Sequence, residues 1–456
     1  MVGAPGPVPR LSLLGLLVAG CPRTPQVVPP PPGLALPEQG LTAGDLQEIR
    51  DRVVPMVEEA AGRRFDEVPF VGLGTADGLA RIVREDSLIV LGGVYGLPEE
   101  VVHEMARTDP LQVSSLIGKY APRGGTLYIA PDSIEAMVAE GVVEADQREA
   151  VLELIIAHEL THALQDQEQD LVEQLASRRD DEALRALQAV TEGQATRVEE
   201  LVAERLGHTE LFWELVELQG WGPEGLVEPM AWPIWAQYGQ GRDYVIWLEA
   251  EGGTDRVWRA VREPPQSTTA LWRPEREDVG LAGPPELLDG VEAVLTAGEW
   301  VALGAHLGEW DLRRVLYGVD DEVLDDALTP VRAGSRLTAY RDDRRCEVWV
   351  VVLDEPAEEL VDLVRQTAEQ VAQTLEPAGL AVADQAFTAL PADDALARVV
   401  APAGPHSASV ETASVWMARG ERLVVIEVEG FRPGLRMERA LELVWSRLEA
   451  DEPGDH

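Results

Sequence analysis

Two histidines four residues apart enclose a glutamate in the stretch AHELTHALQDQ, residues 157–167. On a helix, residues i and i+4 lie on one face, so His158 and His162 can present two imidazole nitrogens to one metal ion. Glu159 lies about 100° further round the helix, within reach of a water molecule bound to that metal. The pattern H-E-x-x-H therefore predicts a zinc centre with Glu159 as general base. The alternative is a pair of polar residues on a wet helix face, which the apolar neighbours disfavour.

The two histidines leave a catalytic zinc ion one protein ligand short, because such ions normally have three protein ligands and one water. The apolar pattern predicts one helix that continues to about residue 176 and a second helix over 182–206, with a break between them. At 1.5 Å per residue, an antiparallel pair of these helices would return Glu192 to about the level of His162. Glu192 is therefore the predicted third ligand, with an ordinary surface carboxylate as the alternative.

Two features of the second predicted helix bear on this interpretation. Gly193 removes a side chain where the two helices would approach each other closely. Glu199 and Glu200 lie on the same helix, and we interpret them as ordinary surface carboxylates.

The segment His158–Ala163 resembles the active-site helix of thermolysin-like zinc metallopeptidases, including an acidic residue four positions on, Asp166. With Glu192, the chain is similar to the gluzincins, whose third ligand is a glutamate on the following helix. Residues 120–275 resemble uncharacterised bacterial lipoproteins of this clan more than thermolysin itself, through Glu192-Gly193-x-Ala195 and Pro264–Thr268. The resemblance implies hydrolysis of a peptide bond by a zinc-activated water, with Glu159 passing a proton to the leaving amine.

The resemblance also implies how a polypeptide substrate would bind. The strand predicted at 126–130 resembles the edge strand on which these peptidases pair an extended substrate through backbone hydrogen bonds. An ordinary strand inside a sheet is the alternative interpretation of those residues.

Several positions depart from the family pattern. Thermolysin-like enzymes have an aspartate four residues after the ligand glutamate, as partner of a zinc histidine, and this chain has Thr196 there. Asp166 or a backbone carbonyl is the predicted substitute, because a ligand histidine usually needs such an acceptor. The spacing between histidines and glutamate is also longer than in thermolysin. The motif identifies no oxyanion donor; Tyr238, His208 and Tyr244 are the candidates.

The charge of the chain excludes some partners. It has 81 acidic and 38 basic residues and a formal net charge of −43. Nucleic-acid binding needs clustered lysine and arginine, and so does docking on anionic lipid, so neither is expected.

The first residues predict export. Arg10 is followed by a short apolar run, Leu11–Ala19, and then by Gly20-Cys21. The run is too short to remain as a membrane span, and it resembles a bacterial lipoprotein signal at 1–21 that leaves Cys21 as a lipidated N-terminus. The alternative is an ordinary secretory signal. The expected location is the bacterial cell envelope, with membrane contact through Cys21 only, or secretion if the lipid is absent.

The remaining chain divides into three predicted parts. Residues 22–40 are a proline-rich tether. Residues 41–283 form a metallopeptidase-like domain, of which 41–140 is α+β and 141–283 is helical and carries the zinc site. Residues 284–456 form a C-terminal α+β accessory domain. The predicted fold class is α+β, with a thermolysin-like catalytic domain.

The boundaries of several elements follow from local patterns. In the first domain we predict a helix over 43–62 and strands over 68–73 and 87–91. In the last domain, strand, strand and helix occur twice, which suggests an internal duplication. Its predicted elements are helices at 300–316, 356–375 and 435–448, and strands at 335–340, 346–353, 414–419 and 423–428.

These observations favour a surface-anchored zinc metallopeptidase. One rival is a zinc-containing lipoprotein with low or no peptidase activity that acts as a binding or assembly factor. Another is a zinc hydrolase that acts on a non-peptide amide. The absence of an identified oxyanion donor favours the binding factor, whereas Glu159 argues against it, because a structural site has no use for a base beside the metal.

Overall fold

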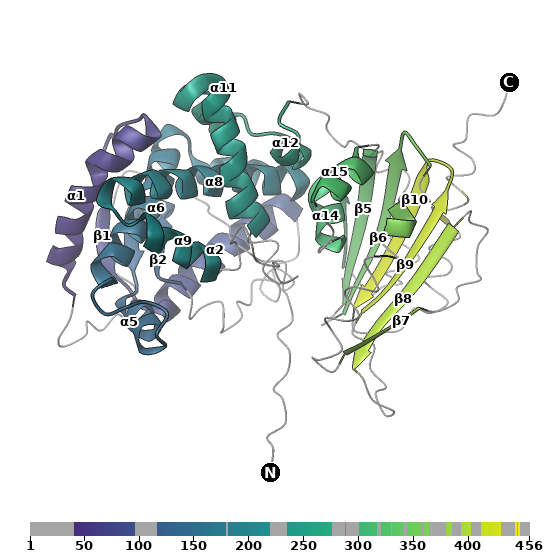
Figure 1. The fold of residues 1–456 in the computed structure, drawn as a ribbon, viewed down its shortest axis with the longest axis horizontal. Coiled ribbons are helices and arrows are strands. Elements are labelled where there is room, and N and C mark those ends of the chain that lie inside the picture. Colours follow the sequence, from purple (N-terminus) through teal and green to yellow (C-terminus); the bar gives the residue numbers. More distant parts are fainter. Residues whose placement is uncertain are drawn as a thin grey trace, which may run out of the picture. The chain divides into compact units, whose positions relative to one another are not determined.

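The computed structural model is a mixed α and β structure (Figure 1), so the predicted α+β class is confirmed at that level. The signal peptide with Cys21, the tether and most of the helices predicted at 356–375 and 435–448 lie outside the described residues. The structure describes residues 41–95, 116–178, 181–218, 235–275, 288, 301–316, 321–329, 331–341, 344–356, 360–363, 366, 380–384, 394–402, 412–429, 443–444 and 446.

The chain divides into two compact units, Met1–Arg179 with Ala183–Pro265, and Asp180–Glu182 with Gln266–His456. The division falls at Gln266 rather than at the predicted residue 284. The reason is that the segment after Pro265 is bonded into the second unit. The carboxylate of Glu182 accepts hydrogen bonds from the backbone N–H of Thr268 at 2.6 Å and from the hydroxyl of Ser267 at 3.0 Å.

The first unit combines a small sheet with helices. Its described elements are α1 (Ala43–Ala61), β1 (Phe70–Leu73), α2 (Ala76–Tyr95), β2 (Gly118–Ala121), η1 (Pro122–Gly124), β3 (Thr126–Ile129), α5 (Pro131–Ala139), α6 (Arg148–Glu168), α7 (Leu171–Ser177), α8 (Asp181–Leu206), α9 (Thr209–Leu218), the π-helical turn η2 (Ala236–Gln240) and α11 (Gly241–Arg262).

Helix α1 shows why these segments fold as the patterns predict. Thr42 and Asp45 form a reciprocal capping box at its start, and Gly62 ends it with a left-handed φ of 65°. The buried residues recur at helical spacing and pack against α6: Leu46, Ile49, Val53, Val57 and Ala61.

The three-stranded sheet has the order β1-β3-β2, with β1 parallel and β2 antiparallel to β3. Both edges of β3 are therefore occupied, and the prediction that residues 126–130 are an edge strand open to a substrate is wrong. Among the described strands, β2 forms the edge of the sheet nearest α6. The prediction of a strand at 87–91 is also wrong, because those residues continue α2. The buried residues of α2, Leu79, Ala80 and Val83, have helical spacing.

The first of the two predicted long helices is shorter than expected. It ends at Glu168 instead of continuing to about 176, and a separate helix, α7, follows it. Asp170 causes the break, because its carboxylate accepts the N–H of Glu173 at 2.8 Å and so caps a new helix. The second predicted helix is present as α8.

The second unit contains a seven-stranded antiparallel sheet of order β4-β5-β6-β10-β9-β8-β7 (Figure 1). Both predicted strand pairs are confirmed as the hairpins β5–β6 and β9–β10. The helix predicted at 300–316 is wrong in its first part, because 301–306 pairs with β5 as a strand. The described elements are α12 (Thr269–Trp272), β4 (Val301–His306), α14 (Glu309–Val315), α15 (Asp321–Leu328), β5 (Val331–Arg341), β6 (Arg344–Leu353), β7 (Leu380–Asp384), β8 (Asp394–Pro402), β9 (Thr412–Arg419) and β10 (Arg422–Glu429).

The pairing of the strands shows that the sheet consists of two halves with the same arrangement. The two hairpins close at Arg341/Arg344 and Arg419/Arg422, 78 residues apart (341 to 419, 344 to 422). At the junction of the halves, Val348 pairs with Ile426, the residue 78 positions further on (348 to 426). A residue of β6 thus pairs with the equivalent residue of β10, so a local two-fold axis lies between these two strands.

Candidate metal centre

Helix α6 is a dry support for the H-E-x-x-H residues. Leu154, Ile156, Ala157 and Leu160 are fully buried, so the helix is covered on most sides rather than along one stripe. His162 is 2% exposed and Glu159 8%. Charges and dipoles near these side chains are therefore poorly screened by water, and their interactions are strong.

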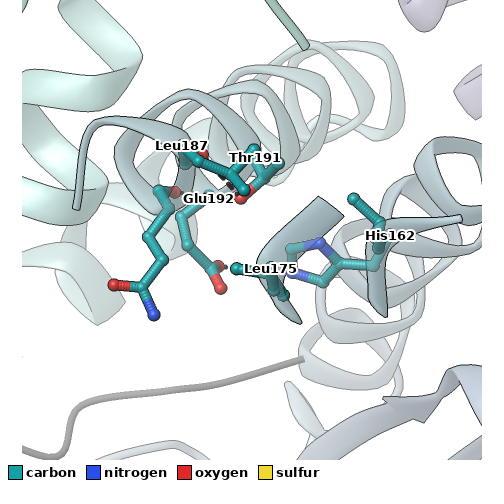
Figure 2. Close-up of a pocket in the computed structure, with 7 residues that line it drawn as sticks. His162, Leu175, Leu187, Thr191 and Glu192 are labelled. Atoms are coloured by element: carbon teal, nitrogen blue, oxygen red, sulfur yellow. Dashed lines mark hydrogen bonds and ion pairs between the residues drawn. The ribbon is translucent and has the colours of Figure 1, made fainter. Parts of the chain in front are cut away.

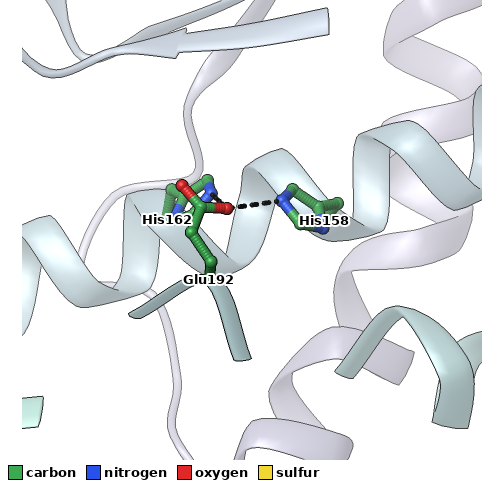
Figure 3. A group of neighbouring side chains, drawn as sticks. All are labelled: His158, His162 and Glu192. Carbon is green, nitrogen blue, oxygen red and sulfur yellow. Dashed lines mark hydrogen bonds and ion pairs between the residues drawn. The ribbon is translucent and has the colours of Figure 1, made fainter. Parts of the chain in front are cut away.

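His158, His162 and Glu192 meet between α6 and α8, with His162 and Glu192 pointing toward each other (Figure 2). Oε2 of Glu192 lies 3.2 Å from Nε2 of His158 and 3.3 Å from Nε2 of His162 (Figure 3). The donor atoms of all three lie within 4.8 Å of one another, and the group could hold a metal ion.

Two of the three separations between donor atoms match those in a small tetrahedral site. Zinc binds histidine nitrogen and carboxylate oxygen at about 2.0–2.1 Å, and two ligands at such distances in a tetrahedron lie about 3.3 Å apart. The observed separations between Nε2 and Oε2 are 3.2 and 3.3 Å. Two imidazoles and one carboxylate are also a ligand set that catalytic zinc uses.

Each histidine is oriented by a second hydrogen bond through its other nitrogen. Nδ1 of His158 lies 3.0 Å from the carboxylate of Glu199, and Nδ1 of His162 lies 2.9 Å from Oε1 of Gln165. Both acceptors keep the proton on Nδ1 and leave Nε2 for a metal. Gln165 is fully buried, and its amide donates to the backbone oxygen of Thr191 at 2.8 Å, which fixes its orientation.

The interpretation of Glu199 and Glu200 as ordinary surface carboxylates is wrong. Glu199 faces His158, as its position seven residues after Glu192 would have indicated, because i and i+7 lie on one helical face. Glu200 is 5% exposed and forms ion pairs with Arg197 at 2.7 Å and Arg242 at 2.5 Å.

The charge state of the metal-free group follows from these contacts. Burial alone would lower the pKa of His158, but its hydrogen bonds to Glu192 and Glu199 raise it to about 10. Burial raises the pKa of Glu192, and the two histidines overcome this effect and hold it well below the ordinary range. Without a metal, the group is therefore a protonated imidazole between carboxylates.

Glu159 points to the outer edge of β2. One of its carboxylate oxygens accepts the backbone N–H of Tyr120 in β2 at 2.6 Å. The hydroxyl of the same tyrosine donates to Asp166 at 3.0 Å, so β2 is fastened to α6 at two points. Asp166 therefore does not serve as the acceptor of a site histidine, which corrects the prediction. Burial raises the pKa of Asp166 to about 6.

Of the candidate oxyanion donors, Tyr238 is the one in contact with the metal group. Its ring stacks on His158 with a centroid distance of 5.9 Å, and its hydroxyl is hydrogen-bonded to Glu192. Burial, followed by the charges of Glu192 and Glu159, raises the pKa of Tyr238 well above 10, so its hydroxyl keeps its proton. The other two candidates are engaged in other contacts: His208 binds Glu153 at 2.8 Å, and Tyr244 stacks on Trp247.

Thr196 occupies the place of the family's aspartate without taking over its function. Its hydroxyl donates to the backbone oxygen of Glu192 at 2.9 Å, a bond within α8. It therefore orients no histidine, and Glu199 one turn further along α8 has that contact.

A close crossing of two helices positions Tyr238. The predicted close approach at Gly193 exists, but its partner is Gly241 in α11 rather than the H-E-x-x-H helix. A Cβ on Gly193 would lie 2.2 Å from the carbonyl carbon of Gly241, and a Cβ on Gly241 would lie 2.1 Å from the oxygen of Ala189. Tyr238 lies three residues before this contact, in the π-helical turn η2, an irregularity often found at functional sites.

No protein-family model matches the chain, and no curated protein does. Among solved structures, the extracellular domain of PknH from Mycobacterium tuberculosis is similar at 11% identity and a TM-score of 0.25, covering 36% of this chain and 94% of that chain. A similarity of that size carries no argument about fold or function. Of the helices that the structure describes, none is both long and apolar enough to cross a lipid bilayer.

Proposed function

We propose that this protein is a zinc-dependent metallopeptidase of the gluzincin type with a thermolysin-like catalytic domain, held in the bacterial cell envelope by a lipid on Cys21. The observation that supports the proposal is the geometry of His158, His162 and Glu192, in which each imidazole Nε2 lies 3.2 or 3.3 Å from the carboxylate oxygen of Glu192 and all donor atoms lie within 4.8 Å of one another. Glu159 follows the first ligand directly and has its carboxylate at the sheet edge, where a base for hydrolysis is needed.

The polypeptide substrate would bind along β2. The N–H of Tyr120 donates to Glu159 of α6 rather than to β3, so the outer edge of β2 faces α6 at this residue. An extended peptide that adds as a strand at this edge would have to replace Glu159 as the partner of the Tyr120 N–H, and it would then pass directly beside that carboxylate.

Each side chain then has one task. A bound zinc ion would polarise the scissile carbonyl and acidify a water molecule. Glu159 would take a proton from the attacking water and deliver it to the leaving amine. Tyr238 keeps its proton and would turn its O–H from Glu192 to the oxygen that becomes negatively charged. Glu199 and Gln165 would keep the two imidazoles in place.

A second candidate is a zinc-containing binding or assembly factor of low activity. The deep burial of His162 and Glu192 favours it, because structural zinc sites are closed to solvent. The third rival, hydrolysis of a non-peptide amide, would use the same residues on a different substrate.

The experiment that separates the candidates uses the full chain. Bound zinc is measured by elemental analysis, and cleavage of an unfolded protein is followed for the wild type and for Glu159→Gln. We expect one zinc per chain in both, with cleavage lost in the variant. Glu149→Gln is the matched control, because that carboxylate lies on the same helix with its side chain 67% exposed. Zinc without cleavage by the wild type would favour the binding factor, and no zinc would refute both candidates.

A further inference from the structure

A small pocket lies against the metal group on the side of His162 (Figure 2). It is formed by α7, which lies in the chain between the two ligand-bearing helices, and by one face of α8. We call it the α7 pocket, and the residues that line it are His162, Leu171, Leu175, Leu187, Gln188, Thr191 and Glu192.

The walls of the α7 pocket are apolar. Leu171, Leu175 and Leu187 are 2%, 3% and 0% exposed. The hydroxyl of Thr191 donates to the backbone oxygens of Leu187 and Gln188 in its own helix. Of the residues that line the pocket, only Gln188 is partly exposed, so the pocket opens to solvent at Gln188.

Both nitrogens of the His162 imidazole, which lines the pocket, already have partners. Nδ1 of His162 is bonded to Gln165, and its Nε2 faces Glu192. A buried water usually makes about three hydrogen bonds. The leucines of this pocket offer none, so a buried water would be poorly satisfied in it, whereas an aliphatic group would gain contacts on several sides.

The size of the pocket limits the occupant. The volume open to the centre of a water-sized sphere is about 10 Å³, which corresponds to roughly one water molecule or one methyl group. We propose that the α7 pocket binds the small aliphatic side chain of a substrate residue beside the scissile bond and rejects larger ones. This inference rests on the proposed function, because it needs a peptide at the metal group.

Binding of alkyl hydroxamic acids tests the pocket without relying on turnover. These compounds chelate zinc, and their alkyl chain can be lengthened one carbon at a time. Calorimetry on the zinc-loaded wild type should give the tightest binding with acetohydroxamic acid and weaker binding with the butyl and hexyl homologues.

Leu175→Ala should enlarge the pocket and shift the optimum to longer chains. Each extra methylene that becomes buried is worth about 0.8 kcal/mol, or roughly fourfold in affinity. Two methylenes should therefore improve the longer homologues by roughly tenfold or more relative to acetohydroxamic acid. Leu175→Val is the milder variant if the alanine variant does not fold. Leu46→Ala is the matched control, a fully buried leucine of α1 outside the pocket.

A parallel assay uses peptides that differ only in the residues flanking the cleaved bond, from glycine and alanine to leucine. The wild type should prefer the small residues, and Leu175→Ala should accept leucine. An unchanged order of hydroxamates and peptides in folded, zinc-bound, active variants would overturn the pocket and leave the peptidase intact. Failure of the wild type to bind zinc or hydroxamate would instead refute the proposed function, and the inference with it.

Discussion

Replacing Gly193 with alanine should separate the helices that hold Tyr238 against the metal group. The added Cβ would lie 2.2 Å from the carbonyl carbon, 2.3 Å from the carbonyl oxygen and 2.6 Å from the next amide nitrogen of the crossing chain at Gly241–Arg242. All three are backbone atoms, so no side chain can rotate away. Ordinary contact begins at about 3.4 Å, and α8 and α11 would have to move apart by about an ångström.

The expected cost follows from two opposing effects. Over-packing a tight contact costs typically 1–3 kcal/mol, and a contact between two backbones belongs at the upper end. Alanine in place of glycine inside a helix contributes about 1 kcal/mol in favour of folding. The variant should therefore lose about 2 kcal/mol of unfolding free energy. The same displacement moves Tyr238 and Glu192, so zinc affinity should fall by about tenfold or more.

Both quantities can be measured on the same samples, by urea unfolding of the metal-free chain and by competition with a zinc chelator. Gly44→Ala is the matched control, because Gly44 is a helical glycine whose added Cβ would meet nothing closer than the Thr42 hydroxyl at 3.5 Å. It should be neutral or stabilising by up to about 1 kcal/mol. A Gly193→Ala variant as stable as wild type, with unchanged zinc affinity, would show that the crossing does not hold the site together.

Three further predictions concern charge. The pKa of Asp166 is raised from 3.8 to about 6; the native state therefore holds this proton more tightly, and stability is lost as pH rises from about 4 to 6. Between these limits Asp166→Asn should gain up to about 3 kcal/mol relative to wild type, as judged by urea unfolding at pH 4 and pH 7. Glu199→Gln should weaken zinc binding by about 10–100-fold in a chelator competition, while Glu204→Gln, exposed on the same helix, should not. With the pKa of His158 at about 10, zinc should displace about one proton per chain at pH 8, where a histidine of ordinary pKa would release almost none; calorimetry in buffers of different ionisation enthalpy measures this number.

Local patterns predicted the parts of the fold that short stretches of chain determine. The helix predicted over 43–62 from its apolar spacing is α1, Ala43–Ala61. The hairpin predicted at 414–419 and 423–428 is likewise present, as the slightly longer strands Thr412–Arg419 and Arg422–Glu429. The spacing of His158 and His162 on one helical face is likewise a local property, and it is the strongest signal of the site.

The sequence predicted less where the outcome depends on distant partners. Helical periodicity alone predicts that the first long helix continues past Glu168. It does not indicate the cap at Asp170, which starts a new helix there. The order of a sheet cannot be read from one strand, so the sequence leaves residues 126–130 open between an edge strand and an ordinary inner strand; the structure has them inside the sheet, with Gly118–Ala121 at the edge. Gln165 was missed because its function requires contacts with both His162 and the facing helix.

The partner of His158, Glu199, is charged, whereas the partner of His162, Gln165, is neutral. This difference sets the net charge of the site. A divalent ion would be neutralised by Glu192 and Glu199, and burial of a site without net charge costs far less than burial of a charged one. A glutamate in place of Gln165 would give the metal ion and its surrounding residues a net negative charge beside Glu159. The neutral amide gives His162 the same orientation without that charge. Glu159 would then be a carboxylate whose charge the metal and its ligands do not balance, which suits its proposed role as a proton acceptor.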